Sequence, residues 1–286
     1  MATRTLTLGH SPDPDDAFMF CALAHDRVDT EGLAFEHVLQ DIQTLNERAE
    51  RGELDITALS LFAYASLADR YRLTTCGASV GDGYGPLLIS SREISSDDWT
   101  EDTVIHVPGR RTTAFLVLRL YAGDVRTEVL PFDQILPAVA EGRIENGLLI
   151  HEGQITYRDH GVFKVEDLGE WWGRETHGLP LPLGVNAVRR DLGEELCLKL
   201  QRVLRRSIEW GLENRAEALE YASEYGRGID ALTNDRFVGM YVNDFTIDLG
   251  ERGRAAVVTL LARAEDAGLI DKDVPLDFIP QTDQTP

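Results

Sequence analysis

The sequence has few cysteines, few lysines and no long apolar run. Its three cysteines are an odd number at wide spacings, so they form neither a disulfide framework nor a metal-binding cluster, and they fit a reduced compartment. No stretch approaches the roughly 18 consecutive apolar residues that a membrane-spanning helix needs. We therefore expect no insertion into a membrane.

Several targeting and catalytic signatures are missing as well. The first residues run directly into a short strand and an acidic loop, without the basic and apolar regions of a secretory signal. We therefore expect a cytoplasmic protein. No HExxH, CxxC, P-loop or G-x-S-x-G pattern occurs, so nothing indicates a metal site, a nucleotide-phosphate loop or a serine nucleophile. The glycines of residues 81–85 precede an extended segment and do not open a helix, which excludes a dinucleotide-binding turn.

Acidic residues outnumber basic ones by 49 to 28, for a net charge of −21 at pH 7. Such a surface repels nucleic acid and anionic membranes, and we exclude both as partners. The acid excess and the scarcity of lysine fit a salt-adapted protein as well as an ordinary soluble one. A small anionic ligand would need a local positive potential that opposes this field. Nothing in the sequence indicates an oligomeric state.

Strand patterns alternate with helical ones along the first half of the chain. In the first unit, strands are predicted over 4–8, 33–39 and 54–60, and helices from Pro14, over 41–52 and over 61–71. A second unit repeats this order, with strands over 102–107, 126–131 and 144–150 and helices over 115–123 and 132–142. Such alternation predicts parallel βαβ units, so we expect two similar α/β units in tandem.

Two extended segments that contain glycine and proline, 83–91 and 181–190, flank the second unit as hinge strands would. The predicted fold is therefore α/β, with two lobes and a cleft between them. A larger discontinuous domain would hold residues 1–88 and 186–286, and a smaller inserted domain would hold residues 89–185.

Only helical patterns follow the second hinge segment. They are expected to pack on the first lobe and cover 192–213, 215–226, 230–243 and 250–268. The tail, 273–286, is expected to be loosely ordered.

Ligands in such a fold bind in the cleft, at the carboxyl ends of strands and at helix N-termini. In the loop 10–16, Ser11 can donate to a ligand, although a rigid capping loop without a ligand role also explains it. Ala58, Leu59 and Ser60 end a strand where a helix begins. Ser60 is explained by helix capping alone, but the N–H groups beside a cap also bind anions.

The loop 108–114 is the best candidate for a carboxylate site. Gly109 allows close approach of the backbone, Thr112 and Thr113 offer hydroxyl and N–H groups, and Arg110 and Arg111 supply positive charge. Two threonines that open a helix are also ordinary caps, and an arginine there can simply face solvent.

His151 directly follows the predicted strand 144–150. At the carboxyl end of a strand that faces a cleft, an imidazole is well placed to act as a general base. The alternative is a structural histidine whose hydrogen bonds are satisfied within the fold.

Several longer motifs carry a resemblance to one family. They include SPDPDDAFMF, DIQTLNERAERGELDITALSLFAYA, PGRRTTAFL, IENGLLIHEGQITY and WWGRETHGLPLPLG. Over essentially its whole length, the chain resembles the 1,4-dihydroxy-6-naphthoate synthases of the futalosine route to menaquinone.

The resemblance implies a two-domain fold related to the type II periplasmic binding proteins, used inside the cell. It implies a lyase that converts cyclic dehypoxanthinyl futalosine to 1,4-dihydroxy-6-naphthoate with loss of the sugar-derived fragment, without a metal or organic cofactor. It also implies that His151 is the base. It places substrate contacts on the segment that ends in Ser60 and on Thr113 and Ala114. Together with the loops described above, the expected substrate contacts are Ser11, Ala58, Leu59, Ser60, Arg110, Thr112, Thr113 and Ala114.

This chain departs from the family pattern at four positions. Asp13 and Asp15 stand where a cysteine and an asparagine are common, Ala58 replaces a lysine, and Arg111 replaces a histidine. The positive charge of the cleft would therefore move from the position of Ala58 to that of Arg111. A paralogous enzyme for a related small carboxylate, a dehydratase acting on chorismate and a solute-binding protein are the alternatives.

Overall fold

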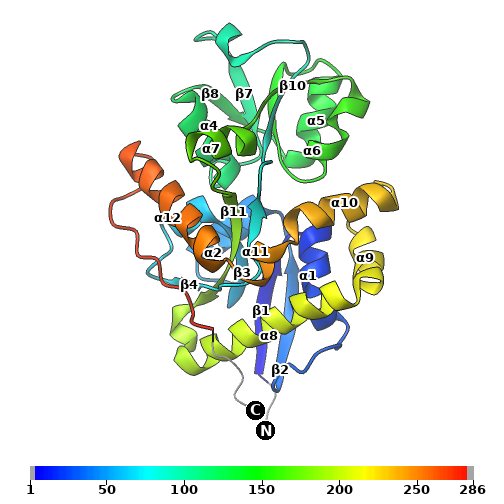
Figure 1. Cartoon of the computed structure of the whole chain (residues 1–286), viewed down its shortest axis with the longest axis vertical. Coiled ribbons are helices and arrows are strands. Elements are labelled where there is room, and N and C mark those ends of the chain that lie inside the picture. The colour runs from blue at the N-terminus through cyan, green and yellow to red at the C-terminus, as the bar shows by residue number, and fades with distance from the viewer. Residues whose placement is uncertain (1–3, 282–286) are drawn as a thin grey trace.

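Residues 4–281, which the computed structural model describes, form two lobes that are each built on a β-sheet (Figure 1). The sheet of the large lobe has the strand order β2-β1-β3-β11-β4, with β5 paired to β11. The sheet of the small lobe has the order β10-β6-β9-β7-β8. The predicted α/β fold with two lobes is confirmed.

The strands of the large lobe are β1 (Arg4–His10), β2 (Leu33–Leu39), β3 (Ile56–Ser60), β4 (Tyr71–Leu73), β5 (Ser79–Gly81) and β11 (Leu181–Arg189). Those of the small lobe are β6 (Leu87–Ser90), β7 (Val104–Val107), β8 (Arg126–Val129), β9 (Asn146–Leu149) and β10 (Phe163–Asp167). Strand β1 is parallel to β2 and β3, and β7 is parallel to β8 and β9. The parallel units are therefore confirmed, while β6, β10 and β11 complete the sheets as antiparallel strands.

Helices cover both sheets. The large lobe holds α1 (Pro14–Ala24), α2 (Ile42–Glu50), α3 (Leu61–Tyr64), α8 (Glu194–Glu213), α9 (Arg215–Ser223), α10 (Ala231–Tyr241), α11 (Asp244–Ile247) and α12 (Gly250–Asp266). The small lobe holds α4 (Thr113–Ala122), α5 (Phe132–Ala140), α6 (Gly153–Thr156) and α7 (Leu168–Glu175). Short 3₁₀ turns cover Ser96–Asp98, Tyr157–His160 and Arg190–Leu192. Within residues 4–281, no helix has the length and apolar character that crossing a membrane requires.

Local sequence explains where the main helices begin and which side they bury. Pro14 opens α1, because proline has no N–H group to leave unpaired in a first turn. Helix α8 buries Leu200, Leu204 and Ile208, which recur at intervals of four residues on one side. Helices α8, α9 and α10 pack on α1, so the predicted return of the C-terminal helices to the first lobe is confirmed.

The helix predicted over 61–71 is much shorter in the structure. Helix α3 ends at Tyr64, and Tyr71 already belongs to β4, which pairs with β11. The hydroxyl of Tyr71 also donates to the carbonyl of Leu54 at 2.8 Å. Pairing with a distant strand therefore overrides the local helical pattern.

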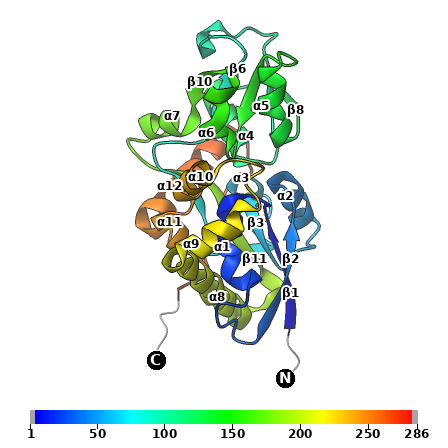
Figure 2. The ribbon, with the colours of Figure 1, turned by 90° about the vertical axis from the view of Figure 1, so that its right-hand side faces the viewer.

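The chain crosses between the lobes twice within the described residues, between β5 and β6 and between α7 and β11 (Figure 2). Both crossings fall in or beside the predicted hinge segments. Beside them, a single apolar cluster joins Leu59 and Tyr64 of the large lobe to Leu116, Leu148 and Trp172 of the small lobe. The predicted domain boundaries at 88/89 and 185/186 stay a prediction. The chain enters the sheet of the small lobe at Leu87 and returns to the sheet of the large lobe at Leu181.

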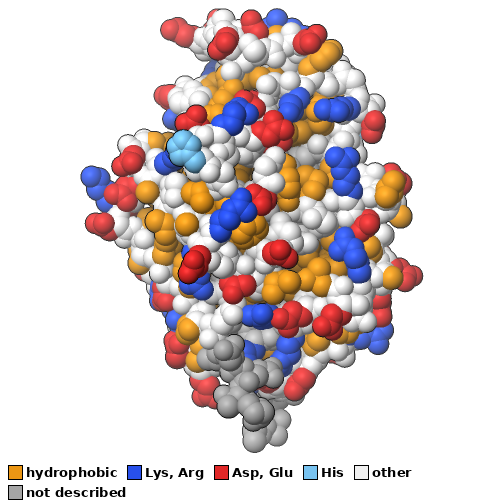
Figure 3. Space-filling view, viewed as in Figure 1, with side chains coloured by type: hydrophobic (Ala, Val, Ile, Leu, Met, Phe, Trp, Pro, Cys, Tyr) orange, Lys and Arg blue, Asp and Glu red, His pale blue; other side chains and the backbone are white. Residues whose placement is uncertain are grey.

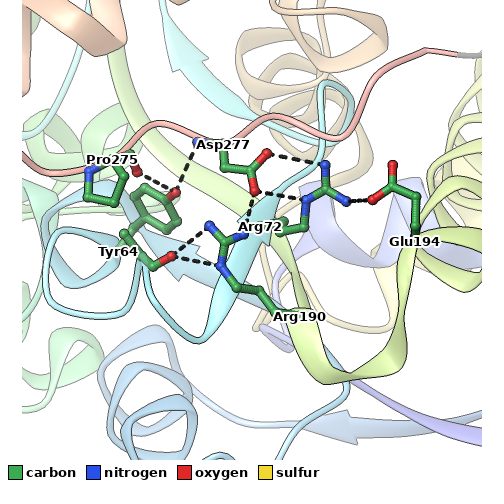
Figure 4. A network of polar contacts seen from close by, with 7 residues as sticks. Tyr64, Arg72, Arg190, Glu194, Pro275 and Asp277 are labelled. Atoms are coloured by element: carbon green, nitrogen blue, oxygen red, sulfur yellow. Dashed lines mark hydrogen bonds and ion pairs between the residues drawn. The ribbon is translucent and has the colours of Figure 1, made fainter.

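The prediction of a loose tail is wrong for residues 273–281, and 282–286 lie outside the described residues. The N–H group of Leu73 donates to the carbonyl of Asp277 at 2.9 Å, and Ile279 is fully buried. The carboxylate of Asp277 accepts from Arg72 and Arg190, and the hydroxyl of Tyr64 donates to the carbonyl of Pro275 (Figure 4). These contacts fasten the tail to the edge of the large-lobe sheet.

Replacing Asp277 by asparagine should lower the free energy of unfolding by about 1–3 kcal/mol at pH 7, because two arginines lose a charged acceptor. Burial raises the pKa of Asp277, but Arg190 and Arg72 lower it below its ordinary value. The stabilisation is therefore present above pH 4 and is lost as the pH falls through the lowered pKa. Denaturant unfolding from pH 3 to pH 7 checks this, with the exposed Asp271→Asn as control. Equal effects of the two substitutions at pH 7 would contradict it.

Candidate active site

A cavity lies between the two lobes and holds about 700 Å³ of space, including its open mouth. The loop before α1, the end of β3 and strand β11 line it from the large lobe. The first turn of α4 and the segment after β9 line it from the small lobe. Its apolar wall consists of Ile42, Pro86, Ile150, Leu183, Val185 and Phe237.

The structure brings together most of the residues predicted for the site. Those that line the cavity are Ser11, Ala58, Ser60, Thr112, Thr113, Ala114 and His151. Leu59 instead belongs to the apolar cluster between the lobes, because successive strand side chains point to opposite faces of a sheet. Arg110 is exposed and donates to the carbonyl of Thr127 at 3.1 Å.

The loop 108–114 does not supply the positive charge that was predicted. Arg111 forms an ion pair with Glu50 and donates to the hydroxyl of Ser66 at 3.2 Å. A Cβ atom on Gly109 would collide with Gln43, so this glycine makes room for α2. Among the described residues that line the cavity, three are carboxylates and none is a lysine or an arginine.

The two threonines of this loop hold the fold together with their hydroxyl groups. Thr112 caps α4 by accepting from the N–H group of Phe115 at 3.1 Å. The hydroxyl of Thr113 donates to the carbonyl of Leu183 at 2.6 Å and accepts from the N–H group of Phe62 at 3.2 Å. What α4 offers to a ligand is therefore the N–H groups of Thr113 and Ala114, which have no acceptor within their own helix and favour an anion.

Ser60 and Ser11 are fixed from behind by polar neighbours. The hydroxyl of Ser60 accepts from Asn46 Nδ2 at 3.1 Å, and its N–H group donates to Asn46 Oδ1 at 3.0 Å. A hydroxyl that accepts in this way keeps its own hydrogen for a ligand. The N–H group of Ser11 donates to Asp16 Oδ2 at 2.6 Å.

Asp13, Asp15 and Asp16 line the cavity from the start of α1 and are almost fully buried. Burial, followed by the charge of Asp13, raises the pKa of Asp15 to about 6. Burial and the charge of Asp15 raise the pKa of Asp16 well above its ordinary value.

His151 lies two residues after the end of β9, with a φ of +58° that is uncommon for residues other than glycine. Its side chain is 15% exposed, and its ring packs edge-on against Phe132 at 4.7 Å between centroids. Its Nδ1 atom is 3.2 Å from Asp13 Oδ2. A buried carboxylate therefore lies beside the imidazole.

Arg227, between α9 and α10, was missed by sequence reasoning. Its Nη2 atom is 2.5 Å from Asp13 Oδ1, and its guanidinium makes two contacts of 2.7 Å with Glu152. Burial lowers the pKa of Arg227, but the two carboxylates raise it above its ordinary value. Burial likewise raises the pKa of Glu152, and Arg227 brings it below its ordinary value. The three side chains thus form a charged chain that ends at His151.

The fold is shared with solute-binding proteins. The alkanesulfonate-binding protein of Xanthomonas axonopodis pv. citri has a TM-score of 0.72 at 16% identity, over 96% of this chain and 98% of that one. The ligand-binding component of an ABC-type import system from Staphylococcus aureus has a TM-score of 0.70 at 13% identity, over 97% of each chain. The chain is therefore a two-lobed protein of the periplasmic-binding-protein type whose cleft carries an aspartate–histidine pair.

More similar proteins identify the family. A family profile described as "Menaquinone biosynthesis" matches residues 6–266. The 1,4-dihydroxy-6-naphthoate synthase of Thermus thermophilus is 44% identical over 93% of this chain and 96% of its own length. That of Streptomyces coelicolor is 38% identical over 94% and 96%. A crystal structure from Archaeoglobus fulgidus is 48% identical, with a TM-score of 0.89 over 94% of this chain and 100% of that one.

The chain therefore belongs to the 1,4-dihydroxy-6-naphthoate synthase family of menaquinone biosynthesis, as its motifs predict.

Replacing Asp15 by asparagine should stabilise the protein above pH 6. The raised pKa means that the buried carboxylate opposes folding once it is ionised, so the gain is absent below pH 4 and grows as the pH rises to about 6. Its size at pH 8 should be up to about 3 kcal/mol. Unfolding measured from pH 4 to pH 8 checks this, with the exposed Asp69→Asn as control. A gain that does not change with pH would contradict the assignment.

Proposed function

We propose that this chain is a lyase that converts cyclic dehypoxanthinyl futalosine to 1,4-dihydroxy-6-naphthoate, with His151 as the general base. Membership of the family supports the reaction. The observation that carries the role of His151 is its position, because it lines the cavity between the lobes and contacts a buried carboxylate through Nδ1. That contact leaves Nε2 as the ring nitrogen to accept a proton.

In this mechanism, His151 removes a proton from the spiro-linked part of the substrate. The electron pair that remains expels the sugar-derived fragment, and the gain of aromaticity supplies much of the driving force. The imidazole holds the proton while Asp13 stabilises its positive charge, and it then returns the proton to the departing fragment, which restores the base. The apolar wall, which includes Leu183, Val185 and Phe237, would pack on the flat ring system and exclude water.

The first-turn N–H groups of α4, together with Ser60, would hold the naphthoate carboxylate. Burial and the charge of Asp15 raise the pKa of Asp16, which favours the uncharged form of this carboxyl group beside an anionic substrate. The reaction is an elimination driven by aromatisation, so we propose that it needs no metal or organic cofactor. We also propose a cytoplasmic location, which the biosynthetic role of the relatives supports.

Incubating the purified protein with cyclic dehypoxanthinyl futalosine tests the proposal, with the naphthoate detected by mass spectrometry. We expect the naphthoate and the sugar-derived fragment in equal amounts. A solute-binding protein would bind the compound and return it unchanged. A dehydratase of the same fold would consume chorismate and leave the futalosine derivative intact.

Replacing His151 by asparagine should reduce kcat by about 10²–10⁴-fold, because the base is lost. Asparagine tolerates a positive φ better than most residues, so the loop should keep its shape. Affinity for 1,4-dihydroxy-6-naphthoate should stay within a few-fold. Steady-state kinetics and calorimetry check both values, with the exposed His160→Asn as control. Turnover of the His151 variant close to that of the control would refute the assignment.

A further inference from the structure

Asp13 stands at the N-cap position of α1 but does not cap the helix. Its backbone is extended, with φ −121° and ψ 153°, as an N-cap requires, yet its side chain accepts no hydrogen bond from the first turn. An aspartate at this position usually accepts from an N–H group two or three residues on. Its carboxylate is 1% exposed. Some other interaction must therefore fix it.

That interaction is a bridge between a guanidinium group and an imidazole ring. Asp13 Oδ1 is 2.5 Å from Arg227 Nη2, and Asp13 Oδ2 is 3.2 Å from His151 Nδ1. Each carboxylate oxygen thus faces a different side chain. Arg227 also packs over the ring of Phe132 at 4.9 Å, the same ring that His151 contacts.

The bridge joins the two lobes. Asp13 follows β1 and Arg227 precedes α10, both in the large lobe, whereas His151 and Glu152 follow β9 in the small lobe. A further polar contact spans the cleft nearby, where the hydroxyl of Tyr241 donates to Gln154 Oε1 at 2.7 Å. Figure 2 shows α10 and α6, which carry these two residues, close together between the lobes.

Beside the crossings, the lobes are joined by an apolar cluster as well as by further polar contacts, such as the ion pair of Arg111 with Glu50. The apolar cluster that holds Leu59, Leu116 and Trp172 packs the lobes together beside the crossings, and it would cost much free energy to separate. The contacts at His151 are polar, and water can replace them when the lobes part. Lobe opening would therefore separate His151 from Asp13.

We propose that Asp13, held by Arg227, is a positioning residue that accepts the Nδ1 hydrogen of His151 across the closed cleft and so leaves Nε2 as the base. This rests on the proposed function, because it assigns a partner to the same base. The base is then complete only while the lobes are closed, which couples proton abstraction to the exclusion of water.

Two substitutions at Asp13 distinguish a positioning role from a purely structural role, because the two roles predict opposite orders of activity for the variants. In Asp13→Asn, the amide oxygen must face the Arg227 donor, so the amide N–H₂ group faces His151 Nδ1. That nitrogen must then accept, the ring hydrogen moves to Nε2, and the base is blocked. Asp13→Ala removes the partner without forcing either tautomer.

We expect kcat to fall by about 10³–10⁴-fold in Asp13→Asn, as for a forced wrong tautomer, and by about 10²-fold in Asp13→Ala, through loss of orientation. The isosteric variant should thus be at least about ten times slower than the truncated one. A structural role predicts the reverse order, because asparagine preserves the shape and the contact with Arg227. Asp13→Asn that is as active as Asp13→Ala, or more active, would overturn the proposal.

A second readout needs no substrate. In protein with ¹⁵N-labelled histidine at pH 8.5, where imidazoles are generally deprotonated, long-range ¹H–¹⁵N spectra report the tautomer of each ring. The His151→Asn variant identifies the signal of His151. We expect hydrogen on Nδ1 in the unsubstituted protein and on Nε2 in Asp13→Asn. The same tautomer in both would overturn the proposal.

The two proposals fail in different ways. Turnover that survives in His151→Asn would refute the role of His151 as base, while the spectra would still test its contact with Asp13. Turnover that collapses in His151→Asn, with Asp13→Asn faster than Asp13→Ala, would refute the positioning role alone.

Discussion

The ion pair between Arg227 and Asp13 is the contact on which the arrangement of the cleft depends. A carboxylate that is 1% exposed must have charged or hydrogen-bonding partners, because a lone buried charge costs several kcal/mol. Arg227 supplies the charge and at the same time reaches Glu152 of the other lobe. One guanidinium thus sets the position of the loop before α1 and of the loop that carries His151. The apolar cluster beside the crossings fixes the remaining geometry.

The cleft is acidic like the rest of the chain, whereas the sequence predicts positive charge there. On the face shown in Figure 3, basic side chains are interspersed with acidic ones over both lobes, and the described cavity lining carries three aspartates. In the proposed function, an anion binds to the N–H groups at the start of α4, and the raised pKa of Asp16 favours the uncharged form of its carboxyl group. Backbone dipoles replace the arginines that the sequence had suggested.

The sequence predicts the parallel strands, the tandem units and the crossings because these follow from local periodicity and from glycine and proline. The position of His151 follows equally from the end of a strand. Strand alternation could have excluded Leu59 from the predicted substrate contacts, because Ala58 and Ser60 point to the cavity and the residue between them does not. Arg227 could not be found in this way. It lies 76 residues from His151 in a loop with positive φ, and only the packing of α9 and α10 on α1 brings it to the cleft.

A crystal structure with bound 1,4-dihydroxy-6-naphthoate tests the central claim most directly. The account predicts the carboxylate within hydrogen-bond distance of the first-turn N–H groups of Thr113 and Ala114. It predicts the ring system between His151 and the apolar wall, with Nε2 facing a ring carbon and the contact between Asp13 and His151 intact. A ligand that lies outside the cavity, or one that turns its carboxylate toward Asp15 and away from α4, would contradict it.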